Sequence, residues 1–236
     1  MEQKIRVAIL DDHPPIIEGY VSRLKVTSNI EVVGTCSRGE NLEPMLVEHP
    51  ADVLLLDVLV PISDTNRSPY PILSVIPRLL QMYPDLSILV ISMHNQQSLI
   101  RGVIEAGASG YILKDDPYFL QDLPTIVETV SHGGIYFSQQ AHQQVFRRGN
   151  NSTPQLTSRQ LEALSLCAAY PQDNTAELAE KMKVANSTMR NLLSGAYVIL
   201  DVHSRTAAVA KAQQLGLISP SEESVNLQNL RGKQEG

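Results

Sequence analysis

Side chains able to do chemistry recur in this sequence at the ends of short apolar runs. The run LLLDVLVP carries Asp57 in its middle, although a buried carboxylate is costly unless it is paired, hydrogen-bonded or bound to a cation. Asp11 and Asp12 follow an earlier apolar run, and Ser92 and Lys114 each end a later one. If these side chains meet, they form one polar site at the edge of an apolar core.

Such a site suits phosphoryl transfer to a carboxylate. Three crowded carboxylates repel one another unless a cation joins them, and hard oxygen ligands favour Mg²⁺. Lys114 supplies a positive charge, and Ser92 supplies a hydroxyl donor for the oxygens of a bound anion. Asp57 would be the nucleophile, with the divalent ion and the two donors stabilising the phosphoryl group. A lone Asp at a strand end is usually a turn or cap residue, but five suitable groups together favour a shared site.

The elements that must position these residues alternate along the chain. Runs with the length and β-branched content of strands occupy residues 4–10, 30–36, 52–58, 87–93 and 109–114. Helices are predicted between and after them, over residues 15–25, 40–49, 75–83, 96–106 and 117–132. This order predicts an α/β domain with a doubly wound, five-stranded parallel sheet. Sites in such sheets form at the carboxyl ends of the strands, where all five polar residues fall.

The remaining sequence changes in character. Residues 139–154 are rich in Gln, Asn, Ser and Gly, which predicts a linker between a first domain (1–138) and a second one (155–218). The second domain is predicted to be small and all-α, and residues 219–236 to be a polar tail. Its four helices are expected over 158–169, 175–182, 186–200 and 205–215, capped by Thr157 or Ser158, Asn174, Asn186 or Ser187, and Ser204.

Composition excludes several classes of protein. The 236 residues include 43% hydrophobic side chains, as in an ordinary globular protein, and no apolar stretch approaches the length of a membrane span. The first residues lack a signal-peptide pattern, so we expect a cytoplasmic protein without a membrane partner. The net charge is −6, with 17 acidic against 11 basic residues over 1–150 and eight of each over 151–236. The neutral second part permits a local basic face on the second domain.

The motifs of the first domain resemble those of response-regulator receiver domains. ILDDHP, LLLDVLVP, VISMH and EAGASGYILKDD carry the resemblance, which covers nearly all of residues 4–136. It implies a flavodoxin-like fold and a switch in which phosphorylation draws a hydroxyl toward the phosphoryl group and an aromatic ring follows into the vacated space. The implied roles are Mg²⁺ ligands at Asp11, Asp12, Asp57 and the carbonyl of Leu59, phosphoacceptor Asp57, switch residues Ser92 and Tyr111, and phosphate-binding Lys114.

The second domain resembles the LuxR-type helix-turn-helix that follows receivers in the NarL/FixJ group. The segment from Leu156 to Ile218 carries this resemblance, and its helix beginning near Asn186 would enter the major groove. Lys183 stands at a turn position that is commonly glycine in that family. The implied DNA contacts are to base edges from Ser187, Thr188, Arg190 and Asn191, and to phosphates from Lys183 and Arg205.

Together these resemblances imply a DNA-binding transcription regulator rather than an enzyme. A sensor histidine kinase would phosphorylate Asp57 and so control homodimerisation and binding to double-stranded promoter DNA. The loop ISDTNRSPYPILSV, which is longer than the family's and lacks its glycine, keeps open an atypical receiver controlled by a protein partner, a ligand or constitutive dimerisation. A hydrolase of the haloacid-dehalogenase type is disfavoured, because it needs a second Asp where Leu59 stands.

Overall fold

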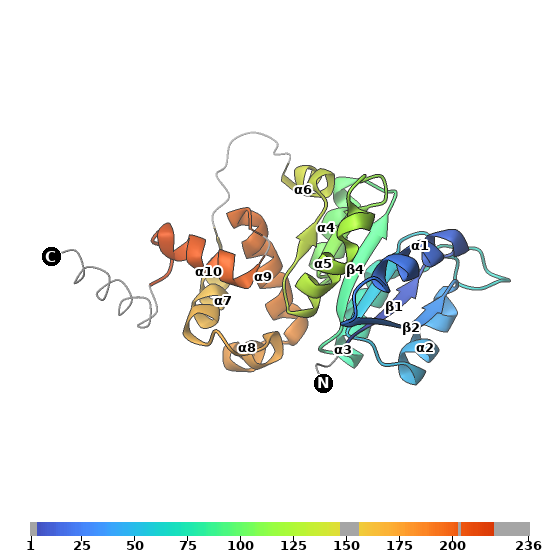
Figure 1. Cartoon of the computed structure of the whole chain (residues 1–236). Helices are drawn as coiled ribbons and strands as arrows, with labels where there is room; N and C mark the ends of the chain where they lie inside the picture. Colours follow the sequence, from blue (N-terminus) through green and yellow to red (C-terminus); the bar gives the residue numbers. More distant parts are fainter. Residues whose placement is uncertain (1–3, 147–155, 203, 220–236) are drawn as a thin grey trace. The chain divides into compact units, whose positions relative to one another are not determined.

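A computed structural model describes residues 4–146, 156–202 and 204–219 of the chain (Figure 1). The chain divides into two compact units, Met1–Ser152 and Thr153–Gly236. None of the helices within the described ranges is both long and apolar enough to cross a membrane.

The first unit is built on a six-stranded sheet in the order β2-β1-β3-β4-β5-β6, and every pair of neighbouring strands is parallel. The predicted doubly wound parallel sheet is therefore confirmed, with one short strand added at its edge. The central strands are buried throughout because helices cover both faces of the sheet. The strands are β1 Ile5–Leu10, β2 Ile30–Cys36, β3 Val53–Asp57, β4 Ser87–Ser92, β5 Gly110–Leu113 and β6 Tyr136–Phe137.

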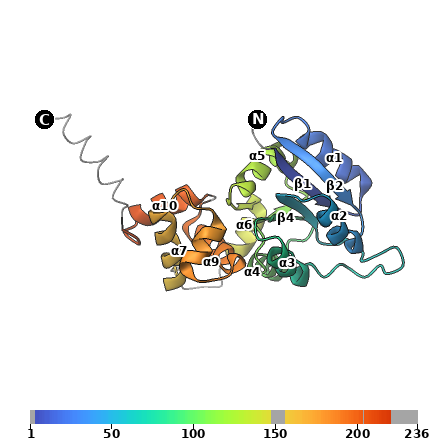
Figure 2. The same cartoon turned by 90° about the horizontal axis from the view of Figure 1, so that it is seen from below.

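Two layers of helices enclose this sheet, as Figure 2 shows. The first layer is α1 (Pro14–Leu24) and α5 (Phe119–Ser131), which pack against each other. The ring of Tyr20 meets that of Phe119 edge-on at 6.0 Å between centroids, within a core that also includes Leu55 and Ile91 from the sheet. The opposite layer consists of α2 Leu42–Glu48, α3 Ile72–Met82 and α4 Gln97–Glu105, with the short 3₁₀ helix η1 Gly39–Asn41 leading into α2.

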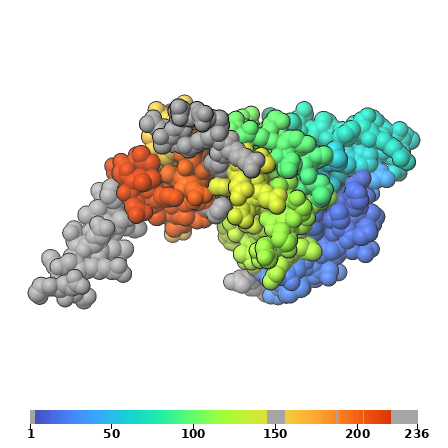
Figure 3. All heavy atoms as spheres, turned by 90° about the horizontal axis from the view of Figure 1, so that it is seen from above, coloured from blue at the N-terminus to red at the C-terminus, as the bar shows by residue number. Residues whose placement is uncertain are grey.

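The predicted linker differs from the structure at its start. Residues 139–146 form a helix, α6 (Gln139–Phe146), directly after β6, although their Gln-rich composition is typical of a linker. Tyr136 N–H and Ser138 N–H donate to the carbonyls of Ser109 and Tyr111, which attaches this segment to β5. Ala141 is completely buried, and α6 packs on α4 (Figure 3). Residues 147–154 of the predicted linker, and residues 220–236 of the predicted tail, lie outside the described residues.

Within residues 156–202 and 204–219, the second unit has four helices at the predicted positions. Thr157 and Asn174 each accept a hydrogen bond from the backbone N–H three residues later, and Ser204 accepts one from Ala207. The start of the third helix differs from the prediction, because its N-cap is Ala185, whose side chain cannot cap. The helices are α7 Ser158–Ala169, α8 Thr175–Met182, α9 Asn186–Leu200 and α10 Arg205–Gln214.

A tight turn joins α8 to α9 and produces the helix-turn-helix arrangement. Lys183 caps α8 in the left-handed conformation, with φ 55° and ψ 46°, and its N–H reaches back to the carbonyls of Ala179 and Glu180. Only two non-glycine residues in the described part of the chain have a positive φ, and the other is Asp201 at the end of α9. Leu178, Met189 and Leu193 are buried between the helices.

Candidate functional site

The sheet brings the predicted polar residues to one edge. Leu10 pairs with Leu56, so Asp11 follows β1 beside Asp57, the last residue of β3. Ser92, the last residue of β4, pairs with Leu113 of β5. Because parallel strands end at a common edge, the sheet places these residues and Lys114 at the same edge.

Lys114 joins two of the carboxylates in an almost dry setting. Its Nζ lies 2.7 Å from Asp11 Oδ2 and 2.8 Å from Asp57 Oδ2. The Lys114 side chain is 8% exposed, and those of Asp11 and Asp57 are 2% and 7% exposed. Burial alone would lower the pKa of the Lys114 ammonium, but its hydrogen bonds to the two carboxylates raise that pKa above the usual value. The lysine is therefore a fixed positive charge beside Asp57.

Four side chains at this edge could hold a metal ion. Ligand atoms of Asp11, Asp12, His13 and Asp57 all lie within 4.8 Å of one another. Three carboxylates in such proximity form the hard oxygen set that Mg²⁺ prefers, so the donor chemistry fits this ion. The sequence interpretation missed His13, whose Nδ1 lies 2.8 Å from Asp12 Oδ1 and 3.3 Å from Asp11 Oδ1. Its position directly after the acidic pair was the available signal.

The two residues of the expected switch are connected through His94. Ser92 is fully buried, and its Oγ accepts a hydrogen bond of 3.1 Å from His94 N–H. Tyr111 is also fully buried, and its hydroxyl donates to the His94 carbonyl at 2.6 Å. Burial raises the pKa of the Tyr111 hydroxyl to about 12, so this group remains a donor at neutral pH. Ser92 and Tyr111 are therefore connected through one residue, and their movement on phosphorylation stays a prediction.

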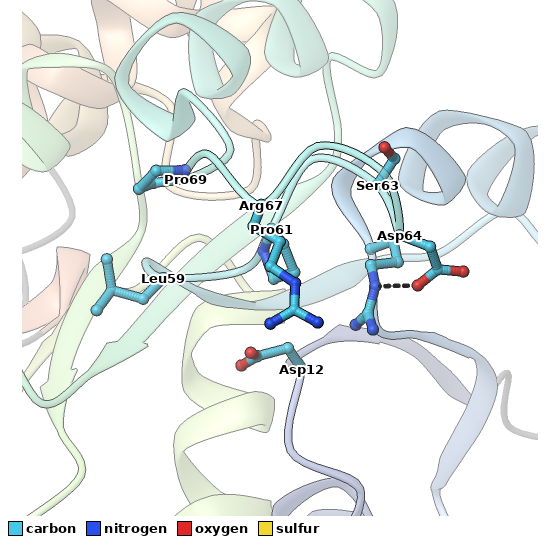
Figure 4. A pocket seen from close by; sticks show the side chains of 8 residues that line it. Asp12, Leu59, Pro61, Ser63, Asp64, Arg67 and Pro69 are labelled. Atoms are coloured by element: carbon cyan, nitrogen blue, oxygen red, sulfur yellow. Dashed lines mark hydrogen bonds and ion pairs between the residues drawn. The ribbon is translucent and has the colours of Figure 1, made fainter.

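The loop after β3 is a hairpin, residues 58–70, which Figure 2 shows projecting beyond α2. Pro61 and Pro69 form an antiparallel bridge across it, and Asp64 accepts a 2.7 Å hydrogen bond from Arg38 Nε. Between the hairpin and the acidic edge lies a pocket of about 490 Å³ (Figure 4), here called the hairpin pocket. It is lined by Asp12, Arg38, Leu59, Pro61, Ser63, Asp64, Arg67 and Pro69. Leu59, predicted to offer its carbonyl to a metal, has a half-exposed side chain on this wall.

The predicted DNA-contacting residues lie on α8, α9 and α10, with varied exposure. Lys183 and Thr188 are exposed, whereas Arg190 and Asn191 are partly buried; the side chain of Ser187 is outside the described residues. Arg205 is engaged within the unit, because its guanidinium donates to the Asp173 carbonyl and to the Thr175 hydroxyl. These bonds hold α10 to the start of α8, which is a structural role that the sequence interpretation did not assign to Arg205.

Comparison with known proteins identifies the family of the first unit and finds relatives that match nearly the whole chain. Residues 7–127, about half of the chain, match the family of response regulator receiver domains. The transcriptional regulatory protein DegU of Brevibacillus brevis is 27% identical, with 92% of this chain and 96% of DegU covered. The probable transcriptional regulatory protein NarL of Mycobacterium tuberculosis is 26% identical, with 92% and 97% covered.

Solved structures agree on the fold. The response regulator RcsB of Salmonella typhimurium superimposes with a TM-score of 0.54 at 23% identity, covering 89% of this chain and 98% of RcsB. RcsB of Salmonella enterica bound to a promoter in the presence of a phosphomimetic matches with the same TM-score at 22% identity, covering 90% and 100%. A receiver fold followed by a helical domain is therefore common to RcsB and this chain. This chain belongs to the response regulator receiver family, and its receiver followed by a helix-turn-helix domain is the arrangement of the NarL/FixJ group.

Proposed function

We propose that this protein is a DNA-binding transcription regulator whose receiver accepts a phosphoryl group on Asp57 from a sensor histidine kinase. The observation that carries the proposal is the Lys114 ammonium, held at 2.7 and 2.8 Å between Asp11 and Asp57 at the carboxyl edge of the sheet. An ion pair with only a structural role needs one carboxylate for one lysine. Here one buried lysine binds two carboxylates, with Asp12 beside them, and this arrangement matches a phosphorylation site.

The chain's own residues support the chemical step. A carboxylate oxygen of Asp57 attacks phosphorus, the bond from phosphorus to the donor's nitrogen breaks, and that nitrogen leaves with the electron pair. Bound Mg²⁺, held by Asp11, Asp12 and Asp57, would neutralise charge on the transferring group. Val58 N–H already donates to Asp57 Oδ1 at 2.6 Å, which fixes the carboxylate and leaves Oδ2 with Lys114. Lys114 then stabilises the charge on the phosphoryl oxygens.

The second unit supports the DNA-binding part of the proposal. α8 and α9 are joined by a three-residue turn, and α9 begins with the polar residues predicted to contact base edges. RcsB, which shares the fold, is known in complex with promoter DNA, and DegU and NarL are transcriptional regulatory proteins. Lys183 and Thr188 are exposed at this end of α9 and are available to a duplex.

Phosphorylation and its consequence can be tested in one experiment. Wild type, Asp57→Asn and the exposed control Asp85→Asn are incubated with a small phosphodonor and Mg²⁺, and intact mass, oligomeric state and affinity for DNA selected from a random library are measured. We expect one added phosphoryl group, dimerisation and tighter DNA binding in wild type and Asp85→Asn, and none of these in Asp57→Asn. DNA binding that is equal in all samples would disprove the phosphorylation switch while leaving DNA binding itself established.

The hairpin favours one second candidate, an atypical receiver controlled by a partner, a ligand or constitutive dimerisation. Residues 58–70 lie beside Asp12 and line one side of the acidic edge, so they border the path of a kinase to Asp57. Replacing the hairpin tip with a short glycine-containing loop distinguishes the two candidates. A phosphorylation rate that rises on shortening supports control by the hairpin, and an unchanged rate and dimerisation contradict it.

A further inference from the structure

The hairpin has a defined shape that is independent of any ligand. Ile62 N–H donates to the Ser68 carbonyl at 3.0 Å, and Gly39 N–H donates to the Pro61 carbonyl at 3.0 Å. The ring of Tyr70 packs so closely on η1 that a Cβ at Gly39 would lie 2.2 Å from it. Since both ends of the hairpin are attached to the body of the receiver, the backbone that forms this wall of the hairpin pocket is held in place.

The two arginines that line this pocket differ in their partners. Arg38 is committed, because it binds Asp64 through Nε and the Ser37 carbonyl through a terminal nitrogen, both at 2.7 Å. Arg67 makes no hydrogen bond or ion pair with any residue in the described part of the chain, although Figure 4 shows its guanidinium directed into the pocket toward Asp12. Asp12 in turn is paired with His13 at 2.8 Å. An uncommitted guanidinium on a preformed wall is therefore the main unused donor here.

The lining indicates what this donor would bind. A guanidinium presents paired N–H donors in a planar fork that matches the oxygens of phosphate or carboxylate. The charge of Arg38 is paired with that of Asp64, so the attraction comes from Arg67, from which a group carrying two negative charges gains more than one carrying a single charge. Leu59, Pro61 and Pro69 add an apolar surface, and the volume of about 490 Å³ is in the range of small-molecule sites. These features together fit an organic phosphate better than a bare ion.

We propose that the hairpin pocket, which adjoins the acidic edge and shares Asp12 and Leu59 with it, takes a small organic phosphate monoester and holds its phosphate on Arg67. The proposal goes beyond phosphorylation of Asp57 and does not depend on it. Asp12 opposes the bound anion and keeps its affinity modest, because both line the pocket. Neutralising Asp12 therefore strengthens binding, whereas neutralising Arg67 weakens it. The control Arg159→Gln removes the same positive charge from the other unit, so an effect limited to Arg67→Gln separates binding in the pocket from general charge attraction to the surface.

The test is an NMR titration of the metal-free full-length protein with glycerol 3-phosphate, following the Arg side-chain N–H signals and the hairpin amides. We compare wild type, Arg67→Gln, Asp12→Asn and the matched control Arg159→Gln, an exposed arginine on α7. We expect Arg67→Gln to weaken binding about ten- to hundredfold, the loss of a charged hydrogen-bonding partner. Asp12→Asn should tighten binding about threefold, and Arg159→Gln should bind as wild type does.

Two controls separate the proposal from simpler explanations. Because Arg67 is exposed and unpartnered among the described residues, its replacement leaves the fold intact, and the unchanged spectrum of the unliganded variant checks this. Titration with acetate tests the class of anion. Equal affinity of wild type and Arg67→Gln for glycerol 3-phosphate would overturn the site, and acetate binding as tightly as glycerol 3-phosphate would overturn the phosphate assignment.

Discussion

Replacing Lys114 by Met tests how the acidic edge is held together. The substitution keeps the length of the side chain and removes the ammonium that lies 2.7 Å from Asp11 and 2.8 Å from Asp57. Two carboxylates, 2% and 7% exposed, are then left without their cation. Removing one partner of a buried ion pair costs about 3–5 kcal/mol, because the remaining charge keeps its desolvation penalty. We expect Lys114→Met to lower the free energy of unfolding of the receiver by an amount in this range.

Adding Asp57→Asn to this variant isolates the electrostatic cause. With one of the two charges neutralised, the loss caused by Lys114→Met should shrink by about 1–3 kcal/mol, the usual coupling energy of residues in contact. Mg²⁺ should also stabilise Lys114→Met more than wild type, since an ion bound by Asp11, Asp12 and Asp57 would supply the missing positive charge.

Hydrogen exchange of the β1, β3 and β5 amides measures the opening free energy of the receiver within the full chain. Lys25→Met, which alters an exposed lysine at the end of α1, is the control for loss of a surface charge. Two results would refute the reasoning: a decrease in opening free energy below about 1 kcal/mol in Lys114→Met, or a decrease that Asp57→Asn fails to reduce. Removing the cation of a buried double ion pair should cost more than this.

Three further substitutions test the surrounding structure. Lys183→Gly should stabilise the second unit by about 1 kcal/mol in hydrogen exchange of α8 and α9, because glycine adopts φ 55° without the steric cost that lysine bears. Equal stability of wild type and Lys183→Gly would contradict this strain. Asp52→Asn should lower the melting temperature at pH 7. Burial would raise the pKa of Asp52, but its hydrogen bonds to Arg6 lower the pKa below 3.8, so this stabilisation is complete above pH 3.8 and is lost on further acidification. A difference in melting temperature that does not shrink as the pH falls below 3.8 would contradict this origin. Ser138→Ala should cost about 1–3 kcal/mol in urea denaturation, since the buried Leu113 N–H loses its acceptor, and unchanged exchange of the Leu113 amide would exclude this cause.

Local pattern was sufficient for most of the fold. Strands β1 to β5 were predictable because each coincides with an apolar run of the length of a strand. Three of the four described helices of the second unit begin at a side chain that was predicted as a possible cap. β6 was missed because two residues, Tyr136 and Phe137, carry no periodicity. α6 was missed because its polar composition resembles a linker, and its stability comes from packing on α4 and β5 rather than from its own sequence.

The residues of the candidate site that lie at strand ends were predictable from the sequence. The contacts between residues far apart in the sequence, across the hairpin, were not. Asp11, Asp57 and Lys114 gather because parallel strands share an edge, which sequence order alone implies. The pairing of Arg38 with Asp64 joins residues 26 positions apart through a hairpin whose shape no local pattern specifies. The hairpin pocket, and the position of Arg67 within it, therefore emerged only from the structure.

The buried position of Tyr111 changes how a signal would leave the site. Its ring is fully buried and its hydroxyl donates to the His94 carbonyl, so a route for the signal through His94 and α4 is open without a movement of the ring. If Ser92 turns its hydroxyl to a phosphoryl group on Asp57, His94 N–H loses its acceptor just before α4 begins. Gln97 on α4 donates to the Gln144 carbonyl on α6, so a shift of α4 reaches the last described helix of the receiver. We therefore expect phosphodonor and Mg²⁺ to change hydrogen exchange in α6, and equal exchange with and without them would show that the signal takes another route.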